Sequence, residues 1–317
     1  MCAGAERRGP PPREPRPAVS RESAHRSAKR RGFRVSAVQD PPLVSVIVPT
    51  FNAEATLAVA LRSLAEQTER DFEVVLSDGA SRDATLRIAE ATAPALPTCR
   101  LLSRPDRGVY DAINLGIAAA RGHWVLILGS DDRLHAPDTL AQVAAALRES
   151  LAAIVYGDVR VMHTSGLGVP AGGRYAGAMP LARLMRGNIC QQAIFYRRRL
   201  FEELGSFDLR YPVLADWEFN LRAAFHAPMQ WVDIVVADYA ATGLSARQED
   251  PAAALGFAEL IRSELIRQRG DRSLWPMQRV LLRQADAFRR RGQWREASRQ
   301  IGSYLWLQGA RGMHLFG

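Results

Sequence analysis

Residues 44–52 read VSVIVPTFN, and this stretch decides the fold class. Val44–Val48 is an apolar, mostly β-branched run that ends at Pro49, as a strand buried in a parallel sheet should. Residues 57–64 repeat leucine at helical spacing and predict an amphipathic helix. The ordered part of the chain therefore opens with a strand, a polar loop and a helix.

The same alternation continues along the chain. Short apolar runs that end in turn residues alternate with segments of helical periodicity, which is the pattern of βαβ units on a parallel sheet. We predict an α/β fold, a Gly-rich mobile segment at about 164–178 and only helices from about 250 onward. The further strands are predicted at 72–76, 100–103, 124–128, 154–156, 192–196 and 231–236, and the further helices at 82–92, 109–121 and 216–226.

Composition excludes several classes of protein. The 317 residues are 47% hydrophobic and 24% charged, which is typical of one large globular domain with attachments, or of two modest domains. No apolar run approaches the ~20 residues that span a bilayer, and the first 40 residues lack the apolar core of a secretory signal. The cysteines, Cys2, Cys99 and Cys190, lie far apart in the sequence. An integral membrane protein, a disulfide scaffold and a zinc finger are therefore not expected.

The net charge of +9 is concentrated at the two ends of the chain. Residues 1–40 carry +6 and residues 251–317 carry +7, so the body between them carries −4. An acidic body does not favour nucleic acid as a partner, whereas basic ends suit an anionic membrane surface. We expect a disordered basic tail over 1–40, a catalytic domain over 41–248 and a helical basic extension over 249–317. The expected location is cytoplasmic, peripheral at the inner face of the plasma membrane.

The extension combines apolar helix faces with many arginines. Its arginines and tryptophans suit an amphipathic surface that rests on anionic lipid. The alternative is a helical pair that packs on the catalytic domain or on a second copy of the chain. One predicted face holds Leu281, Ala285 and Phe288, and the other holds Trp294, Ala297, Ile301 and Tyr304.

Polar side chains stand directly after several predicted strands, where an open parallel sheet binds its ligands. Carboxylates that converge from separate strand ends repel one another, so they are tolerated mainly where a cation or a hydrogen-bonding ligand compensates. Oxygen ligands without a nearby His or Cys suit Mg²⁺ or Mn²⁺, which could bridge a diphosphate. Taken singly, the same aspartates could be turn residues or helix caps. The residues concerned are Thr50, Asn52 and Glu54, then Asp78, then Asp131 and Asp132, and finally Asp216 and Glu218 on either side of Trp217.

Several motifs, in order, resemble the large family-two inverting glycosyltransferases with the GT-A fold. Besides residues 44–52, they are LSDGASRD at 76–83, RPDRGVYDAINLG at 104–116, LGSDD at 128–132 and Asp-Trp-Glu at 216–218. The motif at 104–116 is similar to that of a bacterial subgroup that makes polysaccharides and glycolipids. The resemblance covers about two thirds of the chain and implies a Rossmann-like, mostly parallel mixed sheet with flanking helices.

The resemblance also implies roles for individual residues. Asp216 would be the general base that removes the acceptor proton, and Asp131, with Asp132, would bind Mn²⁺ or Mg²⁺ at the leaving diphosphate. A UDP-sugar is the default donor, and the acceptor would be a hydroxyl of a polysaccharide, a lipid-linked glycan or a glycolipid. The donor-binding residues would be Thr50, Asn52, Glu54, Asp78, Arg107, Asp111, Asn114 and Ser130, and the acceptor or diphosphate region would hold Gln191, Gln192, Trp217 and Glu218.

Two positions depart from the pattern of this family. Gly129 stands at the first position of its D-x-D element, and Gln191 stands where many relatives place a histidine. Glutamine can hydrogen-bond but cannot accept a proton near neutral pH. These departures keep open a catalytically inactive scaffold or membrane-binding module that retains the fold. A nucleotidyltransferase is the other alternative, but the loop over 49–52 lacks a Gly-rich, basic phosphate cradle.

Overall fold

The computed structural model describes residues 40–163, 168–175, 177–241, 250 and 252–313, with side chains described as far as residue 308. The described helices and strands all belong to one compact unit that begins at Pro41. The basic tail predicted over 1–40 lies outside the described residues, apart from Asp40. Part of the Gly-rich segment predicted at 164–178 lies outside them as well.

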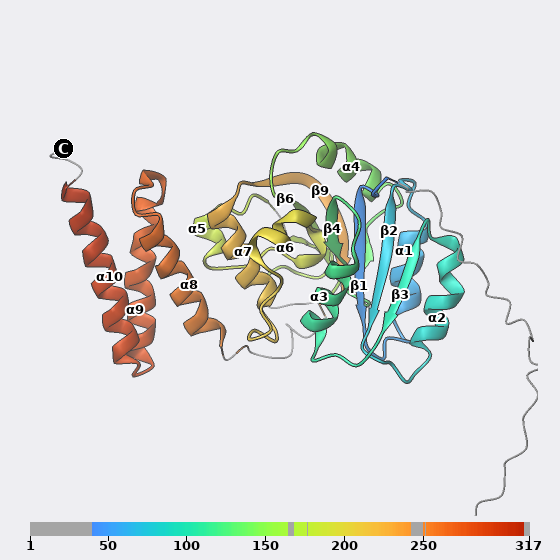
Figure 1. The fold of residues 1–317 in the computed structure, drawn as a ribbon, viewed down its shortest axis with the longest axis horizontal. Helices are drawn as coiled ribbons and strands as arrows, with labels where there is room; N and C mark the ends of the chain where they lie inside the picture. Colours follow the sequence, from blue (N-terminus) through green and yellow to red (C-terminus); the bar gives the residue numbers. More distant parts are fainter. Residues whose placement is uncertain (1–39, 164–167, 176, 242–249, 251, 314–317) are drawn as a thin grey trace, which may run out of the picture. The chain divides into compact units, whose positions relative to one another are not determined.

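A mixed sheet of nine strands forms the centre of the described structure (Figure 1). The strand order is β3-β2-β1-β4-β8-β6-β9-β5, and β7 pairs with β6. The first four strands are parallel, β8 is antiparallel to both of its neighbours, and β6 and β9 are parallel to each other. The C-terminal ends of β1–β4, β6 and β9 therefore share one edge. The strands are β1 (Val44–Thr50), β2 (Phe72–Asp78), β3 (Cys99–Ser103), β4 (Trp124–Ile127), β5 (Arg133–Leu134), β6 (Ile154–Val161), β7 (Arg174–Tyr175), β8 (Ile194–Arg197) and β9 (Met229–Tyr239).

Helices cover both faces of the sheet because its central strands are apolar on both sides. Val46 and Val74 pack in one core layer, and Ile47 and Val75, their neighbours along the strands, pack in the other. The first layer is completed by α1 (Leu57–Ala65), α2 (Thr85–Thr92) and α4 (Thr139–Glu149). The second is completed by α3 (Val109–Ala119), α6 (Arg198–Leu204) and α7 (Ala215–His226). Short elements are η1 (Ala93–Ala95), α5 (Leu181–Leu184) and η2 (Gln191–Ala193).

The predicted fold class is confirmed: the chain is an α/β protein with a mostly parallel mixed sheet, flanking helices and further helices at its C-terminal end. Three helices were not predicted, namely α4, the short α5 and α6. α6 follows β8 directly, so no glycine or proline separates the strand from the helix. Such an uninterrupted junction carries none of the turn signals from which element boundaries are inferred.

Three helices and a 3₁₀ segment follow the sheet domain, and the first of these helices packs against α7. They are α8 (Ala253–Arg267), η4 (Arg272–Arg279), α9 (Val280–Arg290) and α10 (Trp294–Met313). The Trp217 ring on α7 meets the Phe257 ring on α8 edge-on, with centroids 5.1 Å apart. Nε2 of Gln268 donates to the carbonyl of Phe225 at 2.9 Å. Leu281 and Leu307 extend the same buried cluster outward into α9 and α10.

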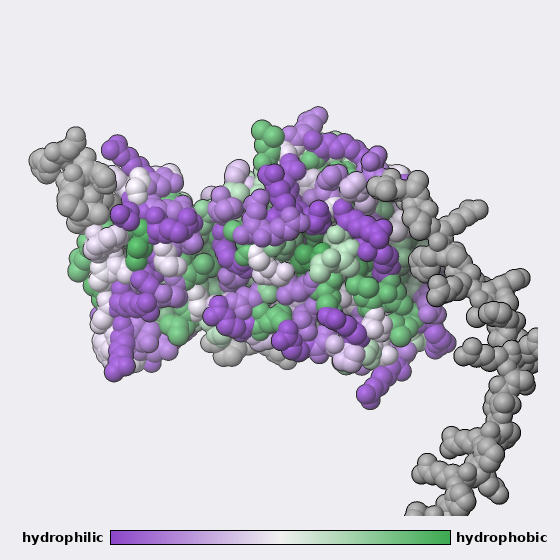
Figure 2. All heavy atoms as spheres, viewed as in Figure 1, coloured by the Kyte–Doolittle hydropathy of each residue, from purple (hydrophilic) through white to green (hydrophobic). Residues whose placement is uncertain are grey.

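The predicted face of α10 is partly wrong. Ala297 is buried as expected, but Trp294 is 63% exposed and Ile301 is 43% exposed. α10 turns positions 297, 300 and 307 toward its neighbours, which leaves positions 294, 301 and 305 together on an adjacent, open side of the helix. Figure 2 shows hydrophobic, green atoms among the hydrophilic, purple ones over α9 and α10. Within the described residues, no helix is both long enough and apolar enough to cross a bilayer.

Candidate active site

The edge formed by the C-terminal ends of the parallel strands gathers the predicted polar residues. In the sheet register Thr50 lies beside Asp78, and Asp78 lies beside Ser103. The turn over 129–132 leaves β4 at the same edge, next to β1. Ligands of open α/β sheets bind at such an edge.

Asp78 ends β2 and is surrounded by hydrogen-bond donors. Its carboxylate accepts from the hydroxyls of Thr50 and Ser103 at 3.1 and 2.7 Å, and from both the hydroxyl and the backbone N–H of Ser81. Burial by itself raises the pKa of Asp78, but the hydrogen bonds from Ser81, Ser103 and Thr50 outweigh it, and the pKa lies below its usual value. This carboxylate is therefore a permanent, charged acceptor at neutral pH.

Asn52 and Glu54 fasten the loop after β1 to the loop after β2. Oδ1 of Asn52 accepts from the backbone N–H of Arg82 at 3.0 Å, and Oε2 of Glu54 accepts from that of Ala84 at 2.8 Å. The backbone N–H of Asn52 donates to the hydroxyl of Ser81, which in turn bonds Asp78. Both predicted residues thus hold the shape of the loops around Asp78.

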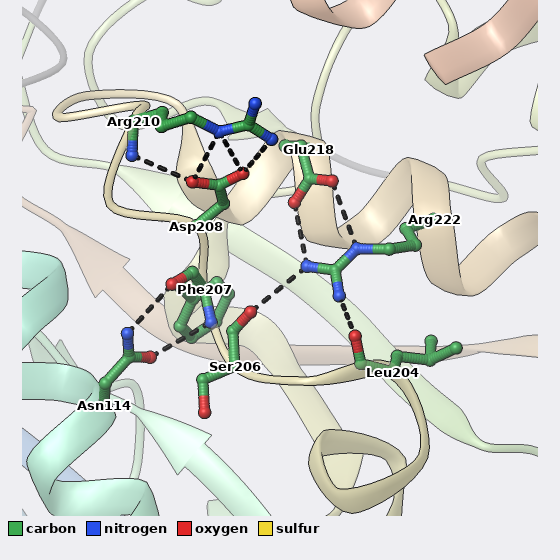
Figure 3. A network of polar contacts seen from close by, with 8 residues as sticks. All are labelled: Asn114, Leu204, Ser206, Phe207, Asp208, Arg210, Glu218 and Arg222. Carbon is green, nitrogen blue, oxygen red and sulfur yellow. Dashed lines mark hydrogen bonds and ion pairs between the residues drawn. The ribbon is translucent and has the colours of Figure 1, made fainter.

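The start of α3 carries an exposed ion pair. Arg107 and Asp111 are one helical turn apart, with Nε 3.3 Å from Oδ2, and the Arg107 side chain is 77% exposed. The hydrogen bond from Arg107 lowers the pKa of Asp111. Asn114 is used differently: its amide exchanges two hydrogen bonds with the backbone of Phe207, at 2.9 and 3.0 Å (Figure 3). Asn114 therefore ties α3 to the 205–211 loop.

Asp131 and Asp132 lie in the turn after β4. Asp132 is buried, and its two oxygens accept from Nε2 of Gln192 and from the backbone N–H of Ala240, both at 2.8 Å. Burial, together with the nearby charge of Asp131, raises the pKa of Asp132 to about 7. Asp131 and Ser130 are half-buried beside it.

Gly129 gives these carboxylates their room. A Cβ atom at position 129 would lie 2.6 Å from Oδ2 of Asp132 and 2.9 Å from Oδ1 of Asp131, both closer than real Cβ contacts allow. Residue 129 is the position at which the family pattern has an acidic residue. The glycine thus leaves the space that the side chains of Asp131 and Asp132 occupy.

Asp131 and Asp132 suit a divalent cation only when a bound ligand supplies further oxygen atoms. Among the described residues, no group of three or more His, Cys, Asp and Glu side chains is placed to hold a metal ion. The charges of the neighbouring carboxylates Asp131 and Asp132 repel each other. Mg²⁺ nevertheless binds to one or two such carboxylates when substrate phosphates supply its remaining ligands. The residues present therefore suit an ion that arrives with a diphosphate.

Asp216 is the second residue of α7 and is only 9% exposed. Its Oδ1 lies 2.8 Å from the hydroxyl of Tyr110, and its Oδ2 accepts from Nδ2 of Asn188 at 2.7 Å. Burial raises the pKa of Asp216 to about 6, although hydrogen bonds from Tyr110, from the backbone N–H of Trp217 and from Asn188 act in the opposite direction. A carboxylate with a pKa near neutrality is suited to accept a proton.

The residues beside Asp216 in the sequence have other partners. Nε1 of Trp217 donates to the carbonyl of Leu184 at 2.7 Å. Glu218 is buried in a two-point ion pair with Arg222, with contacts of 3.1 and 2.9 Å (Figure 3). Both side chains stabilise the packing around α7.

The segment entering β8 connects the two aspartate sites. Asn188 contacts Asp216 and Gln192 contacts Asp132. Nε2 of Gln191, between them, is buried and has no hydrogen-bond partner. Tyr110 and Asn188 were not among the predicted site residues. Tyr110 lies in the quoted 104–116 motif, whereas Asn188 carries no local signal.

Solved structures of similar fold define the class of protein. The chain superposes on Staphylococcus aureus TarS in complex with UDP-GlcNAc with a TM-score of 0.56 and 25% identity, over 70% of this chain and 65% of that one. It superposes on a mannosyltransferase from Pyrobaculum calidifontis in complex with GDP-Man and Mn²⁺ with a TM-score of 0.51 and 19% identity, over 87% of this chain and 81% of that one. The fold is that of the GT-A glycosyltransferases.

Sequence comparison then identifies the family. The model for glycosyl transferase family 2 matches residues 45–205, about half of the chain. Over 203 residues the chain is 47% identical to a "PGL/p-HBAD biosynthesis glycosyltransferase" of Mycobacterium bovis, covering 62% of this chain and 77% of the relative. It is also 25% identical over 206 residues to chondroitin synthase of Escherichia coli, of which it covers 30%. The chain belongs to glycosyl transferase family 2 and is a glycosyltransferase.

Proposed function

We propose that the protein transfers one sugar, with inversion, from a nucleotide diphosphate donor to an acceptor hydroxyl, and that Asp216 is the general base. The observation that carries the proposal is the buried Asp216 carboxylate with a pKa of about 6, at the same sheet edge as the hydrogen-bonded Asp78. The donor is by default a UDP-sugar. The acceptor is a glycan, a lipid-linked glycan or a glycolipid.

Asp78 holds the nucleoside in this proposal. A carboxylate that stays charged accepts the N–H donors of a base, and Thr50 lies beside it next to the loop that Asn52 and Glu54 hold in place. The exposed pair of Arg107 and Asp111 contacts the donor phosphates and sugar, and Ser130 lines the approach to them.

Asp216 removes the acceptor proton as the acceptor oxygen attacks. That oxygen forms a bond with the anomeric carbon on one face, and the bond from this carbon to the donor phosphate breaks on the opposite face, with its electron pair leaving on the diphosphate. Gln191 and Gln192 lie between the two aspartate sites and donate hydrogen bonds on the diphosphate side. When bound, Mg²⁺ or Mn²⁺ held by Asp131, with Asp132 beside it, would neutralise charge on the leaving group.

The test is release of nucleoside diphosphate from a panel of UDP-, GDP- and dTDP-sugars that includes UDP-GlcNAc and GDP-mannose, with Mg²⁺ or Mn²⁺. We expect release from one donor, and loss of that release with EDTA and in Asp131→Ala. No release of nucleoside diphosphate from any donor, together with no thermal shift by any nucleotide, would contradict the proposal. Release of pyrophosphate from a nucleoside triphosphate and a sugar 1-phosphate, in place of nucleoside diphosphate release from the panel, would identify a nucleotidyltransferase.

We also propose that α10 rests on an anionic membrane that carries the acceptor. Trp294, Ile301 and Leu305 are 63%, 43% and 61% exposed and lie on one side of the helix. Residues 251–317 carry +7, and Arg269 lies over the neighbouring Trp306 ring at 5.5 Å. An apolar stripe bordered by arginines is how interfacial helices bind anionic lipid.

Vesicle co-sedimentation tests the membrane proposal. We expect the full chain to bind phosphatidylglycerol vesicles more tightly than phosphatidylcholine vesicles, and Trp294→Ser with Ile301→Ser and Leu305→Ser to lose binding. Leu151→Ser is the matched control, since this leucine is 93% exposed after α4. Equal binding of the triple variant and the control would refute the assignment to α10.

A further inference from the structure

A line of buried polar side chains leads to Asp216 from the protein interior. The hydroxyl of Tyr196 donates to Oδ1 of Asn220 at 2.9 Å, and Nδ2 of Asn220 donates to Oδ1 of Asn188 at 2.9 Å. Nδ2 of Asn188 then donates to Oδ2 of Asp216. Tyr196 and Asn220 have no exposed surface. The line joins β8, α7 and the segment before η2 at one carboxylate oxygen.

The charge on Asp216 fixes the direction of every bond in this line. An ionised carboxylate oxygen can only accept, so Asn188 must present its NH₂ group to Oδ2. The amide oxygen of Asn188 then faces Asn220, which must present its own NH₂ group, and Tyr196 supplies the last proton. Hydrogen bonds aligned in one direction strengthen one another in a buried setting.

Tyr110 contacts the other carboxylate oxygen of Asp216, Oδ1. Its hydroxyl lies 2.8 Å from Oδ1 of Asp216 and 2.9 Å from the carbonyl oxygen of Val213. Both are acceptors when Asp216 is ionised, yet a phenol carries one proton. Once Oδ1 carries a proton, both contacts are satisfied: the Asp216 hydroxyl donates to Tyr110, and Tyr110 donates to Val213.

We propose, on the basis of the function proposed above, that Asn188 and Tyr110 are positioning residues for Asp216: Asn188 keeps Oδ2 an acceptor, and Tyr110 reverses its hydrogen bond when Oδ1 takes the acceptor proton. The proton removed from the acceptor hydroxyl thus ends on Oδ1. The electron pair of that O–H bond forms the new bond to the anomeric carbon. Neither residue needs to move between the two states.

The groups that face Asp216 leave it without a cationic partner among the described residues. The titratable side chains that interact with it are Tyr110 on α3, Tyr196 on β8 and Cys190 before η2. Burial raises the pKa of all three, so each is neutral at pH 7. The hydrogen bonds from Tyr110, from the backbone N–H of Trp217 and from Asn188 therefore oppose the effect of burial on Asp216.

The experiment is the pH profile of nucleoside diphosphate release, with the donor from the panel that is turned over, in the full chain and in Tyr110→Phe and Asn188→Ala. We expect the acidic limb to move up by about half a unit to one unit in each variant, because the bond that is lost is charge-assisted and stabilises the ionised carboxylate more than the protonated one. Activity should then fall more at pH 6 than at pH 8. Tyr156→Phe is the matched control, since this hydroxyl accepts from the N–H of Met179. The acidic limb of the pH profile should not move in Tyr156→Phe.

A second measurement needs no turnover. The free energy of unfolding is compared between the full chain and Asp216→Asn across pH 4 to 8, alone and with Tyr110→Phe. An asparagine whose NH₂ group takes the place of protonated Oδ1 fits the same contacts, so this variant should fold. We expect the difference between Asp and Asn to grow with pH, and to grow further in the Tyr110→Phe background.

The outcomes separate the two proposals. If no donor is turned over but the stability difference behaves as expected, the proposed function fails and the positioning network stands. If turnover depends on Asp216 but the acidic limb is unmoved in both variants, the positioning roles are wrong. A stability difference that is the same at every pH would also overturn them, since Asp216 would then not titrate in this range.

Discussion

Two aspartates at one sheet edge have opposite chemistry. Asp78 accepts hydrogen bonds from three hydroxyls and a backbone N–H, and its pKa is lowered. Asp216 is buried among apolar and neutral side chains, and its pKa is raised to about 6. The same residue type thus becomes a permanent acceptor at one place and a proton acceptor at the other. The balance of burial and hydrogen bonds decides which role each carboxylate suits: the donors outweigh burial at Asp78, whereas burial outweighs the donors at Asp216.

The strongest way to break this comparison is Asp216→Asn. If Asp216 is the base, we expect transfer to fall about 10²- to 10⁴-fold, because general bases contribute that much. Donor binding, measured by titration calorimetry, should change less than about twofold, since an interaction made only in the transition state is lost. Near-normal turnover would remove Asp216 from the mechanism.

The same substitution should stabilise the protein at high pH. The folded pKa of about 6 lies above the ordinary value of 3.8, so the stability that Asp216 gives is full below pH 4 and is lost as pH rises through 6. We expect Asp216→Asn to gain about 2 kcal/mol over the unchanged chain between pH 4 and pH 8. Denaturant unfolding at both pH values measures this. Asp132 titrates in both proteins and cancels in the difference.

Asp78→Asn should affect the other half of the comparison. An amide places an NH₂ group against the hydroxyl and N–H donors of Ser81, Thr50 and Ser103, so the loop loosens. We expect the KM for the donor to rise about tenfold or more, while the acidic limb of the pH profile stays in place. A moved limb with an unchanged KM would assign proton transfer to Asp78 instead.

Gly129→Ala tests the turn between the two aspartates. The added methyl group meets Asp132 at 2.6 Å and Asp131 at 2.9 Å. We expect a loss of stability of about 1 to 3 kcal/mol and weaker dependence of activity on added Mn²⁺. Gly302→Ala on α10 is the control: nothing lies within 4 Å of its added carbon, and it should stabilise by at most about 1 kcal/mol.

The order of elements was predictable because the central strands are apolar on both faces and end in turn residues. Val44–Val48 needed no tertiary information. Tertiary information was needed for α6 and for the exposed side of α10, because the sequence around Arg197 and Trp294 does not indicate which elements these residues contact. The site divides in the same way. Asp78, Asp132 and Asp216 follow from their places at strand and helix ends, as do Thr50 and Gln192, whereas the donors Ser81, Ser103, Tyr110 and Asn188 do not.

Asn188 shows the limit most clearly. It precedes β8 by six residues and contacts a carboxylate 28 residues further along the chain. A lone asparagine in a polar segment has many ordinary uses in turns. Only the antiparallel path of β8 brings it to Asp216.

That antiparallel strand also bears on how such an enzyme can change over evolutionary time. Because β8 runs against β4 and β6, the residues that enter it, 188–192, reach both aspartates, while the stretch upstream of them is a connection that begins at β7. Met179 and Leu184 in this connection are buried, whereas Ala182, Arg183 and Arg186 are exposed, so substitutions at the exposed positions change the surface next to α7 without touching Asn188 or Gln192. Under the proposed function, acceptor preference can therefore diversify at these positions while the residues that hold the two aspartates stay the same.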